Sequence, residues 1–189
     1  MLNPDETASL VLAALDRFEI PHMVAGSHAS SYHGKPRSTN DIDLVIAPRT
    51  RRSLVEFAEA FIDERFYASA VAAEEAFRMR GMFNVIDTQT GVKVDLILRK
   101  ARPFSESKFA RRRPARIFGI PVFVATPEDT ILSKLEWAKL GESERQLRDV
   151  GSVLRMSAAT LDLPYIERWA PELGVSELWE RVQREAAAG

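Results

Sequence analysis

Apolar and polar residues alternate with two different periods along the first two thirds of the chain. Apolar residues three or four positions apart line one face of a helix, whereas apolar residues at every second position line one face of a strand. Proline or glycine at positions 21, 34, 48 and 91 separates the segments. The pattern predicts helices over residues 5–18, 26–34 and 50–66, and strands over residues 22–25, 41–46, 83–87 and 93–98.

The pattern changes near residue 100. Residues 101–116 are basic and contain prolines, which predicts a loop or lid, and residues 118–124 predict a turn and a final edge strand. Thr126 and Pro127 then mark a helix start, because threonine caps helices well and proline is favoured at the first helical position. From there to residue 188 the apolar spacing predicts four helices.

These elements indicate an α+β fold, with a small mixed β-sheet and flanking helices followed by a C-terminal helical bundle. We place the α/β core at residues 1–125 and the helical bundle at residues 126–189, and we expect the two to pack as one unit. A length of 189 residues suits one ordinary domain with a helical appendage of this kind.

Composition narrows the class of protein. The chain is 46% hydrophobic and 28% charged, as globular proteins are, and its formal net charge of −1 gives no overall attraction to nucleic acid or anionic membranes. It contains no cysteine, which excludes disulfides and thiolate metal sites and fits a reducing compartment. Acidic residues at positions 5 and 6 do not fit a signal peptide, and no apolar run approaches the ~20 residues of a membrane span. We therefore expect a cytoplasmic protein without a membrane partner.

Aspartates at every second position mark the strand over residues 41–46. Asp41 and Asp43 alternate with aliphatic residues, so both carboxylates face the same way. Adjacent carboxylates repel each other, and a hard divalent cation with oxygen ligands relieves the repulsion. Asp95 repeats the pattern in the strand over residues 93–98, and it joins the pair if the two strands are neighbours. Three carboxylates suit two Mg²⁺ ions.

Gly26 and Ser27 precede the aspartate pair by a spacer of thirteen residues. A Gly-Ser turn that opens a helix offers free backbone N–H groups and a hydroxyl, which suit a phosphate. A phosphate site near a metal site indicates an enzyme that handles nucleotides. An isolated Asp-x-Asp equally fits a solvated strand edge, but the full arrangement is far more restrictive.

The arrangement resembles the signature of the nucleotidyltransferase superfamily with the polymerase-beta-like fold. That signature is a Gly-Gly or Gly-Ser turn, a short helix, Asp-x-Asp and a later carboxylate on a neighbouring strand. Arg37 and Thr39 match what is common in its small bacterial and archaeal branches. The resemblance covers residues 20–155. Three segments are also similar to the nucleotidyltransferase-type toxins of abortive-infection systems, namely residues 126–129, 133–135 and 148–149.

The resemblance implies metal-dependent transfer of a nucleoside monophosphate from an NTP to an acceptor hydroxyl, with release of pyrophosphate. It implies Mg²⁺ as the cofactor, with two ions, and a cognate antitoxin as partner for a toxin-like member. It also implies that Asp95 acts as the base. The residues implied to bind metal and to catalyse are Asp41, Asp43 and Asp95, and those implied to bind the nucleotide are Gly26, Ser27, Arg37, Thr39 and Lys134.

Some of these residues also have plainer explanations. Lys134 fits an exposed helix position, because neighbouring apolar residues line the buried stripe without it. Asp149 is spaced to form a helix salt bridge with Arg145. The basic segment Arg99–Arg116, with phenylalanines between the basic residues, fits either a site for an RNA acceptor or a solvated loop.

Three functions are compatible with the sequence. The first is a nucleotidyltransferase that acts on RNA, protein or a small molecule. The second is a non-catalytic module on the same fold that binds a nucleotide or a partner. The third is a metal-dependent nuclease, which ranks last because it leaves the Gly-Ser turn unexplained. The position of Asp95 relative to Asp41 and Asp43 discriminates between the first two.

Overall fold

The computed structural model describes residues 4–141 and 143–188. The chain forms two compact units. The predicted division at residue 125 put residues 26–38 with the sheet, whereas in the structure they group with the C-terminal helices. The first unit comprises residues 1–25 and 39–124, and the second comprises residues 26–38 and 125–189.

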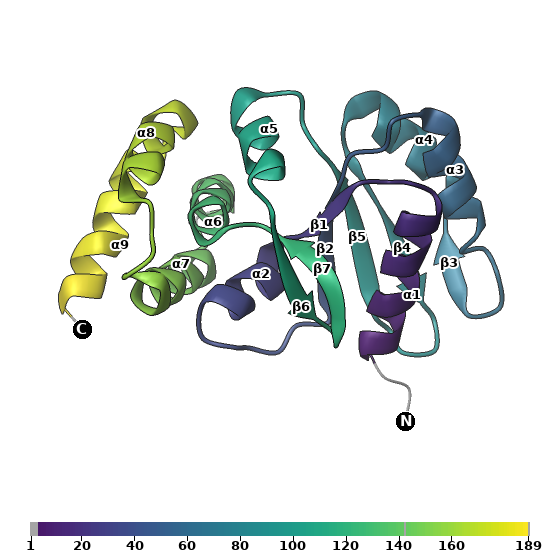
Figure 1. Cartoon of the computed structure of the whole chain (residues 1–189), viewed down its shortest axis with the longest axis horizontal. Coiled ribbons are helices and arrows are strands. Elements are labelled where there is room, and N and C mark those ends of the chain that lie inside the picture. The colour runs from purple at the N-terminus through teal and green to yellow at the C-terminus, as the bar shows by residue number, and fades with distance from the viewer. Residues whose placement is uncertain (1–3, 142, 189) are drawn as a thin grey trace. The chain divides into compact units, whose positions relative to one another are not determined.

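The first unit is built on one mixed sheet, whose strands are labelled in Figure 1. The strands are β1 (His22–Val24), β2 (Asp41–Ile46), β3 (Phe66–Ala68), β4 (Met82–Asp87), β5 (Lys93–Leu98), β6 (Arg113–Ile117) and β7 (Ile120–Val124). Within the described residues they form a seven-stranded sheet in the order β3-β4-β5-β2-β1-β7-β6. β2 runs parallel to β5 and β1 runs parallel to β7, while the other neighbouring pairs are antiparallel. The predicted α+β fold with a mixed sheet is confirmed.

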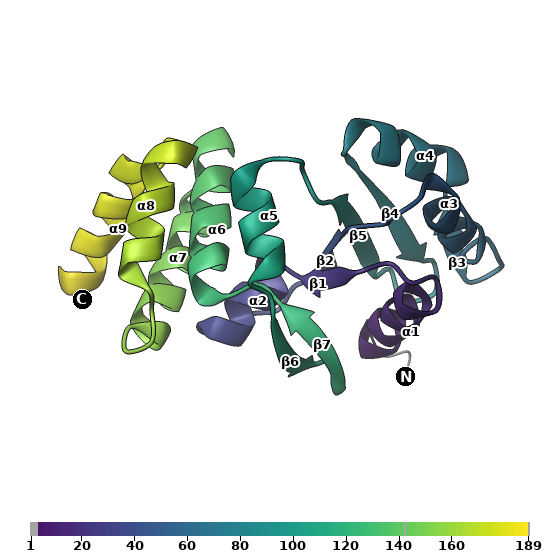
Figure 2. The same ribbon diagram turned by 45° about the horizontal axis from the view of Figure 1, so that its top comes forward.

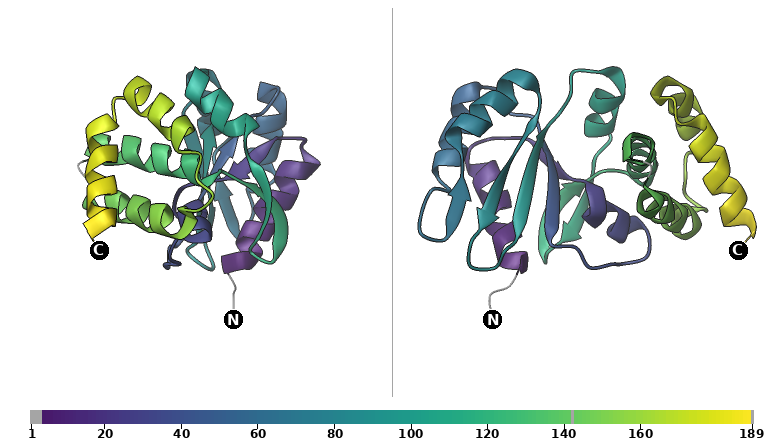
Figure 3. Two further views of the ribbon diagram at one scale, coloured as in Figure 1. Left: turned by 60° about the vertical axis from the view of Figure 1, so that its left-hand side comes forward. Right: turned by 180° about the vertical axis from the view of Figure 1, so that it is seen from behind.

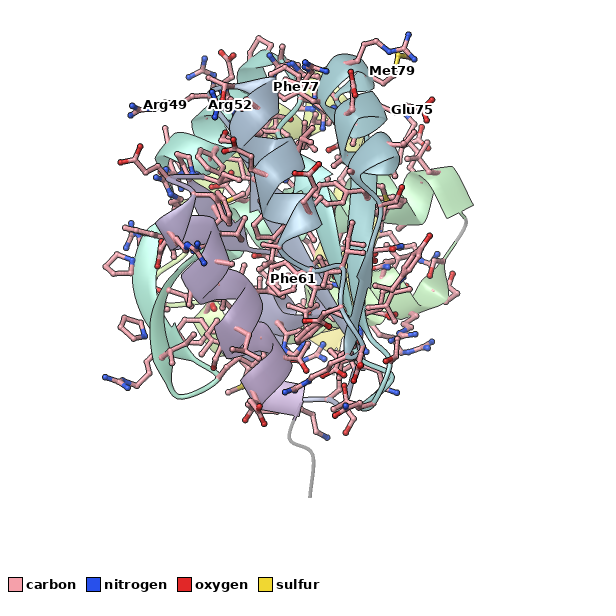
Figure 4. All side chains as sticks on the ribbon, turned by 90° about the vertical axis from the view of Figure 1, so that its right-hand side faces the viewer. Arg49, Arg52, Phe61, Glu75, Phe77 and Met79 are labelled. Carbon is pink, nitrogen blue, oxygen red and sulfur yellow. The ribbon has the colours of Figure 1, made fainter. Side chains whose placement is uncertain are left out.

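Helices α1 (Pro4–Arg17), α3 (Arg51–Glu59) and α4 (Ala70–Met79) lie side by side over one face of this sheet, as Figure 4 shows. Aromatic rings fill the core beneath them. The fully buried ring of Phe57 in α3 packs against Phe18, Phe61 and Phe83, with ring centroids 6.2, 5.2 and 6.4 Å away. Phe61, labelled in Figure 4, follows the end of α3 and is itself buried. This cluster joins the residue that follows α1, helix α3 and strand β4 in one apolar core.

The helix expected over residues 50–66 is shorter than predicted, because α3 ends at Glu59. Asp63 accepts hydrogen bonds from the backbone N–H groups of Arg65 and Phe66 at 2.8 and 2.6 Å, and this turn leads into β3. The prediction was wrong because apolar residues continue at helical spacing through the turn, where a local side-chain hydrogen bond competes with the helix.

The loop expected over residues 101–116 contains helix α5 (Pro103–Ala110) and strand β6. Pro103 looked like a helix breaker, but it stands at the start of α5, where proline is well tolerated. β6 pairs with β7 and is an edge of the sheet, so the prediction that β7 is the edge strand was wrong. Most of β6 is exposed, which explains why it has no apolar alternation. Its arginines and Pro114 suit an edge that must not pair with another chain.

The second unit is helical and consists of α2 (Gly26–His33), α6 (Pro127–Gly141), α7 (Glu144–Ser157), α8 (Leu163–Leu173) and α9 (Ser176–Ala188). The four predicted C-terminal helices are confirmed. Figure 2 labels α6 to α9, and Figure 3 shows them from green to yellow in chain order. Their core includes the fully buried side chains of Ile131, Leu135, Val150 and Val153. No helix in the described ranges is both long and apolar enough to cross a membrane.

A buried carboxylate stabilises the first unit. Asp87 at the end of β4 is fully buried and accepts hydrogen bonds from Thr7 in α1 at 2.6 Å and from Arg65 before β3 at 3.0 Å. Its other oxygen accepts from the backbone N–H of Gln89 at 3.0 Å. Burial by itself would raise the pKa of Asp87, but these hydrogen bonds outweigh it and lower the pKa to about 2. The ionised carboxylate therefore holds three elements of the unit together.

Because the pKa of Asp87 is lower in the folded chain than in the unfolded chain, its contribution to stability is complete above about pH 4 and is lost as the pH falls toward 2. We expect Asp87→Asn to lower the free energy of unfolding by about 2 kcal/mol at pH 7. The difference from the wild type should shrink steadily as the pH falls from about 4 to about 2. Urea unfolding of both proteins across this range measures it, and a difference that does not change with pH would contradict the assignment.

Candidate functional site

Strands β2 and β5 bring the predicted carboxylates together. The two strands pair in parallel with Asp41 opposite Lys93 and Asp43 opposite Asp95. In this register the four side chains emerge on the same face of the sheet, because residues two apart on a strand share a face. The two strands are therefore neighbours, as Asp95 requires in order to join Asp41 and Asp43. The same pairing brings Lys93 to this face, a residue that the sequence interpretation did not use.

Lys93 sits among these carboxylates. Its Nζ lies 3.0 Å from Asp95 Oδ2 and 3.7 Å from Asp41 Oδ1. The hydrogen bond to Asp95 raises the pKa of Lys93 above its usual value, with further contributions from the charges of Asp95, Asp41 and Asp43. Burial differs sharply along the cluster, since the side chain of Asp95 is 9% exposed and that of Asp41 is 59% exposed. Asp95 is thus the buried end of the cluster and Asp41 the solvated end.

The donor set of the cluster suits a hard cation. No three aspartate, glutamate or histidine side chains within residues 4–141 and 143–188 are grouped closely enough to hold a metal ion together. Asp95 Oδ1, however, is buried and has no hydrogen-bond partner. Burying a carboxylate oxygen in this way costs free energy unless a cation binds to it. Asp43 is the direct neighbour of Asp95 across the strands. Carboxylate oxygens are the ligands that Mg²⁺ prefers, so Asp43 and Asp95 are the residues that could hold such an ion.

The predicted phosphate site lies in the second unit. Gly26 has a φ of 55°, in the left-handed region that glycine adopts without strain, and it allows α2 to begin directly after β1. The Ser27 hydroxyl accepts a hydrogen bond of 2.6 Å from Arg37 Nη2. Thr39, the other predicted nucleotide-binding residue near here in sequence, belongs to the first unit, where its hydroxyl donates to the backbone carbonyl of Asp41 at 3.3 Å. The structure thus gives Thr39 a local contact at the start of β2.

Arg37 and Lys134 converge on Asp149. Lys134 Nζ donates to Asp149 Oδ2 at 2.7 Å and to Gln146 Oε1 at 2.9 Å. Arg37 donates from Nε and Nη2 to the two oxygens of the same carboxylate at 3.3 Å. Burial by itself would raise the pKa of Asp149, but the hydrogen bonds and charges of Lys134 and Arg37 outweigh it and lower the pKa below its usual value. Two cations thus share one carboxylate.

The explanations of Lys134 as an exposed helix lysine and of Asp149 as a partner of Arg145 were both wrong. Lys134 is not an exposed helix lysine, since only 5% of its side chain is exposed. Asp149 does not pair with Arg145 on its own helix but with Lys134 of α6 and Arg37 of the segment after α2. The spacing of Arg145 and Asp149 is compatible with a helix salt bridge, but the more buried lysine and the two-pronged arginine bind the carboxylate instead.

A close approach of α2 to α7 positions the segment that carries Arg37. A Cβ atom on Gly34 would lie 2.9 Å from the backbone oxygen of Ser30 and 3.0 Å from the backbone nitrogen of Val153, so only glycine fits there. The next residue, Lys35, donates its backbone N–H to the Ser152 hydroxyl at 2.7 Å. The start of the Arg37 segment is therefore fixed against α7, which also carries Asp149.

The fold has counterparts among solved structures. The chain is similar to an antigenic nucleotidyltransferase-like protein from Paracoccidioides brasiliensis, with a TM-score of 0.57 at 19% identity over 80% of this chain and 75% of that one. It is also similar to the antibiotic-resistance factor ANT(2″)-Ia in solution, with a TM-score of 0.58 at 14% identity over 98% and 97% of the two chains. The fold is that of the nucleotidyltransferases. The crystal structure of ANT(2″)-Ia in complex with adenylyl-2″-tobramycin gives a TM-score of 0.56 at 16% identity, over 89% and 95% of the chains.

The predicted nucleotidyltransferase fold is thereby confirmed for this chain, including its C-terminal helices. No protein-family model matches the chain, and no curated protein matches it either. At these identities the likeness concerns the backbone arrangement. What this nucleotidyltransferase-fold chain does must be argued from its own side chains.

Proposed function

We propose that this chain is a metal-dependent nucleotidyltransferase, which moves a nucleoside monophosphate from an NTP to an acceptor hydroxyl and releases pyrophosphate. The observation that carries the proposal is the pairing of Asp43 with Asp95 on parallel strands, with one buried oxygen of Asp95 left without a partner. A non-catalytic module has no need of such an oxygen, which is costly to bury.

Asp43 and Asp95 would hold the Mg²⁺ ion, with Asp41 at the solvated end of the cluster. Bound there, Mg²⁺ supplies charge stabilisation for the transferring phosphoryl group and lowers the pKa of the attacking hydroxyl. We assign Asp95 to the ion and not to the role of base that the resemblance implied, because Lys93 holds Oδ2 and the ion would take Oδ1.

The cations of the second unit would bind the triphosphate. Asp149 accepts hydrogen bonds from both Arg37 and Lys134 and so holds two cations together, an arrangement that suits a phosphate. Arg37 also holds the Ser27 hydroxyl, and Gly26 and Ser27 supply the backbone N–H groups at the start of α2. Asp149 acts as a positioning residue in this scheme, because it fixes both cations without contacting the nucleotide itself.

We propose RNA as the acceptor, bound by the basic segment Arg99–Arg116. In the structure this segment is ordered as α5 and β6, and Arg112 lies over the rings of Phe109 and Phe123, with its guanidinium carbon 4.3 and 4.9 Å from the ring centroids. Arg113 and Arg116 are exposed on β6. The exposed arginines suit a phosphodiester backbone, and Arg112, which lies over Phe109 of α5 and Phe123 of β7, fixes the start of the strand that carries them.

The test is transfer of label from each α-labelled NTP, with Mg²⁺, to total RNA, total protein or small-molecule hydroxyl compounds such as amino sugars. We expect label in RNA, and its loss in the Arg113→Glu/Arg116→Glu variant, while NTP binding is retained. Label in protein or in an amino sugar would overturn the RNA assignment and keep the transferase. NTP binding without any transfer would favour the binding module, and no NTP binding would limit the likeness to the fold.

A further inference from the structure

We propose that Lys93 is a built-in cation of the carboxylate cluster and takes the place of a second metal ion, so that the site binds one divalent ion. The proposal rests on the proposed function, in that it assumes that Asp43 and Asp95 bind metal. It changes the expected cofactor content from two ions to one ion and one lysine.

Geometry supports this role for Lys93. Its ammonium group lies 3.0 Å from Asp95 Oδ2 and 3.7 Å from Asp41 Oδ1, so it bridges two carboxylates of the cluster as a bound cation would. It occupies one oxygen of Asp95 and leaves the other, buried oxygen without a hydrogen-bond partner. Asp95 thus binds Lys93 through Oδ2 and would bind the ion through Oδ1.

Charge points to the same stoichiometry. Asp41, Asp43 and Asp95 carry three negative charges, and Lys93 neutralises one of them. Before a nucleotide binds, one divalent ion balances the remaining two, whereas a second ion would leave excess positive charge beside a lysine. The neighbouring strand β4 does not alter this balance, because the residue opposite Asp95 is the neutral Asn84. Lys93 is the one basic residue in β2, β4 and β5.

The direct test is the number of Mn²⁺ ions bound per chain in the absence of nucleotide, counted by electron paramagnetic resonance of free Mn²⁺. We expect one ion for the wild type and for Lys93→Arg, which keeps the charge. We expect two ions for Lys93→Ala, because the vacated position leaves two carboxylates without a cation. The exposed Lys100 provides a matched control, since Lys100→Ala removes the same charge outside the cluster and should bind one ion.

Metal-free stability gives a second readout that does not depend on activity. Lys93→Ala should melt at a lower temperature than the wild type without metal, because buried Asp95 loses its counter-charge. Added Mg²⁺ should raise its melting temperature more than it raises that of the wild type. Lys100→Ala should show neither effect.

The outcomes separate this proposal from the proposed function. Two Mn²⁺ ions in the wild type, or a single ion in a folded Lys93→Ala variant, would overturn the role of Lys93 and leave a metal-dependent transferase intact. If neither protein binds Mn²⁺, both the role of Lys93 and the metal dependence of the proposed function are overturned. The wild-type count decides the question even if Lys93→Ala does not fold.

Discussion

Asp43→Asn is expected to reduce nucleotidyl transfer by about a thousandfold or more, because the neutral amide no longer stabilises a bound cation beside the reacting phosphate. Asp43 lies directly opposite Asp95 on the neighbouring strand, so the substitution removes one member of this cross-strand carboxylate pair. The fold should be retained, with an unchanged or slightly higher free energy of unfolding, since the change relieves repulsion between like charges. Steady-state label transfer and urea unfolding of the same preparation measure the two effects.

A matched control for this variant is Asp16→Asn, which removes a carboxylate that is 79% exposed at the end of α1. It should leave both transfer and stability nearly unchanged. A folded Asp43→Asn protein with wild-type transfer would remove Asp43 from the mechanism. An unfolded Asp43→Asn protein would instead give the carboxylate cluster a structural role.

Asp149→Asn is expected to lower the free energy of unfolding by about 3 kcal/mol, because it leaves the buried ammonium group of Lys134 without its counter-charge. Lys134 Nζ lies 2.7 Å from Asp149, and both side chains are largely buried. The double variant Lys134→Met/Asp149→Asn should recover most of that loss, because the buried ammonium group is gone and the cation that remains, Arg37, has a side chain that is 25% exposed to solvent. The stabilities of the single and double variants, measured by urea unfolding, give the coupling between the two residues.

The same double variant separates stability from function. If Lys134 binds the nucleotide phosphates, the double variant should fold well and still bind NTP at least tenfold more weakly, the loss of about 1.4 kcal/mol that a charge-assisted hydrogen bond contributes. Calorimetric titration with each NTP measures this. Wild-type NTP affinity in the double variant would show that the Lys134–Asp149 pair serves only the packing of α6 and α7.

Local patterns predicted the strands of the site well, for a physical reason. β2 and β5 were placed correctly because aliphatic residues alternate with polar ones along both, and the side-chain period of a strand is short enough to recognise in six residues. The four C-terminal helices were found in the same way from their apolar spacing. α5 and β6 were missed because prolines and arginines hide their periods, and neither element has a continuous buried face in its sequence.

The partners within the site were harder to predict than its members. That Asp95 stands beside Asp43 depends on the order of strands in the sheet, which no local pattern encodes. The ion pair of Lys93 with Asp95 was missed although the two residues share a face, because a lysine two positions away on a strand usually points into solvent. Asp149 was matched with Arg145 by helix spacing, whereas its partners lie on other elements and are recognised only from the packing of α2, α6 and α7.

Parallel reactions with α-labelled and γ-labelled NTP distinguish transfer of a nucleoside monophosphate from every other reaction of the nucleotide. We expect the α-label to enter the acceptor while the γ-label appears in pyrophosphate, in equal amounts and only with a divalent cation. Both activities should vanish together in Asp43→Asn. A γ-label in the acceptor, or breakdown of the acceptor without incorporation of either label, would contradict the account.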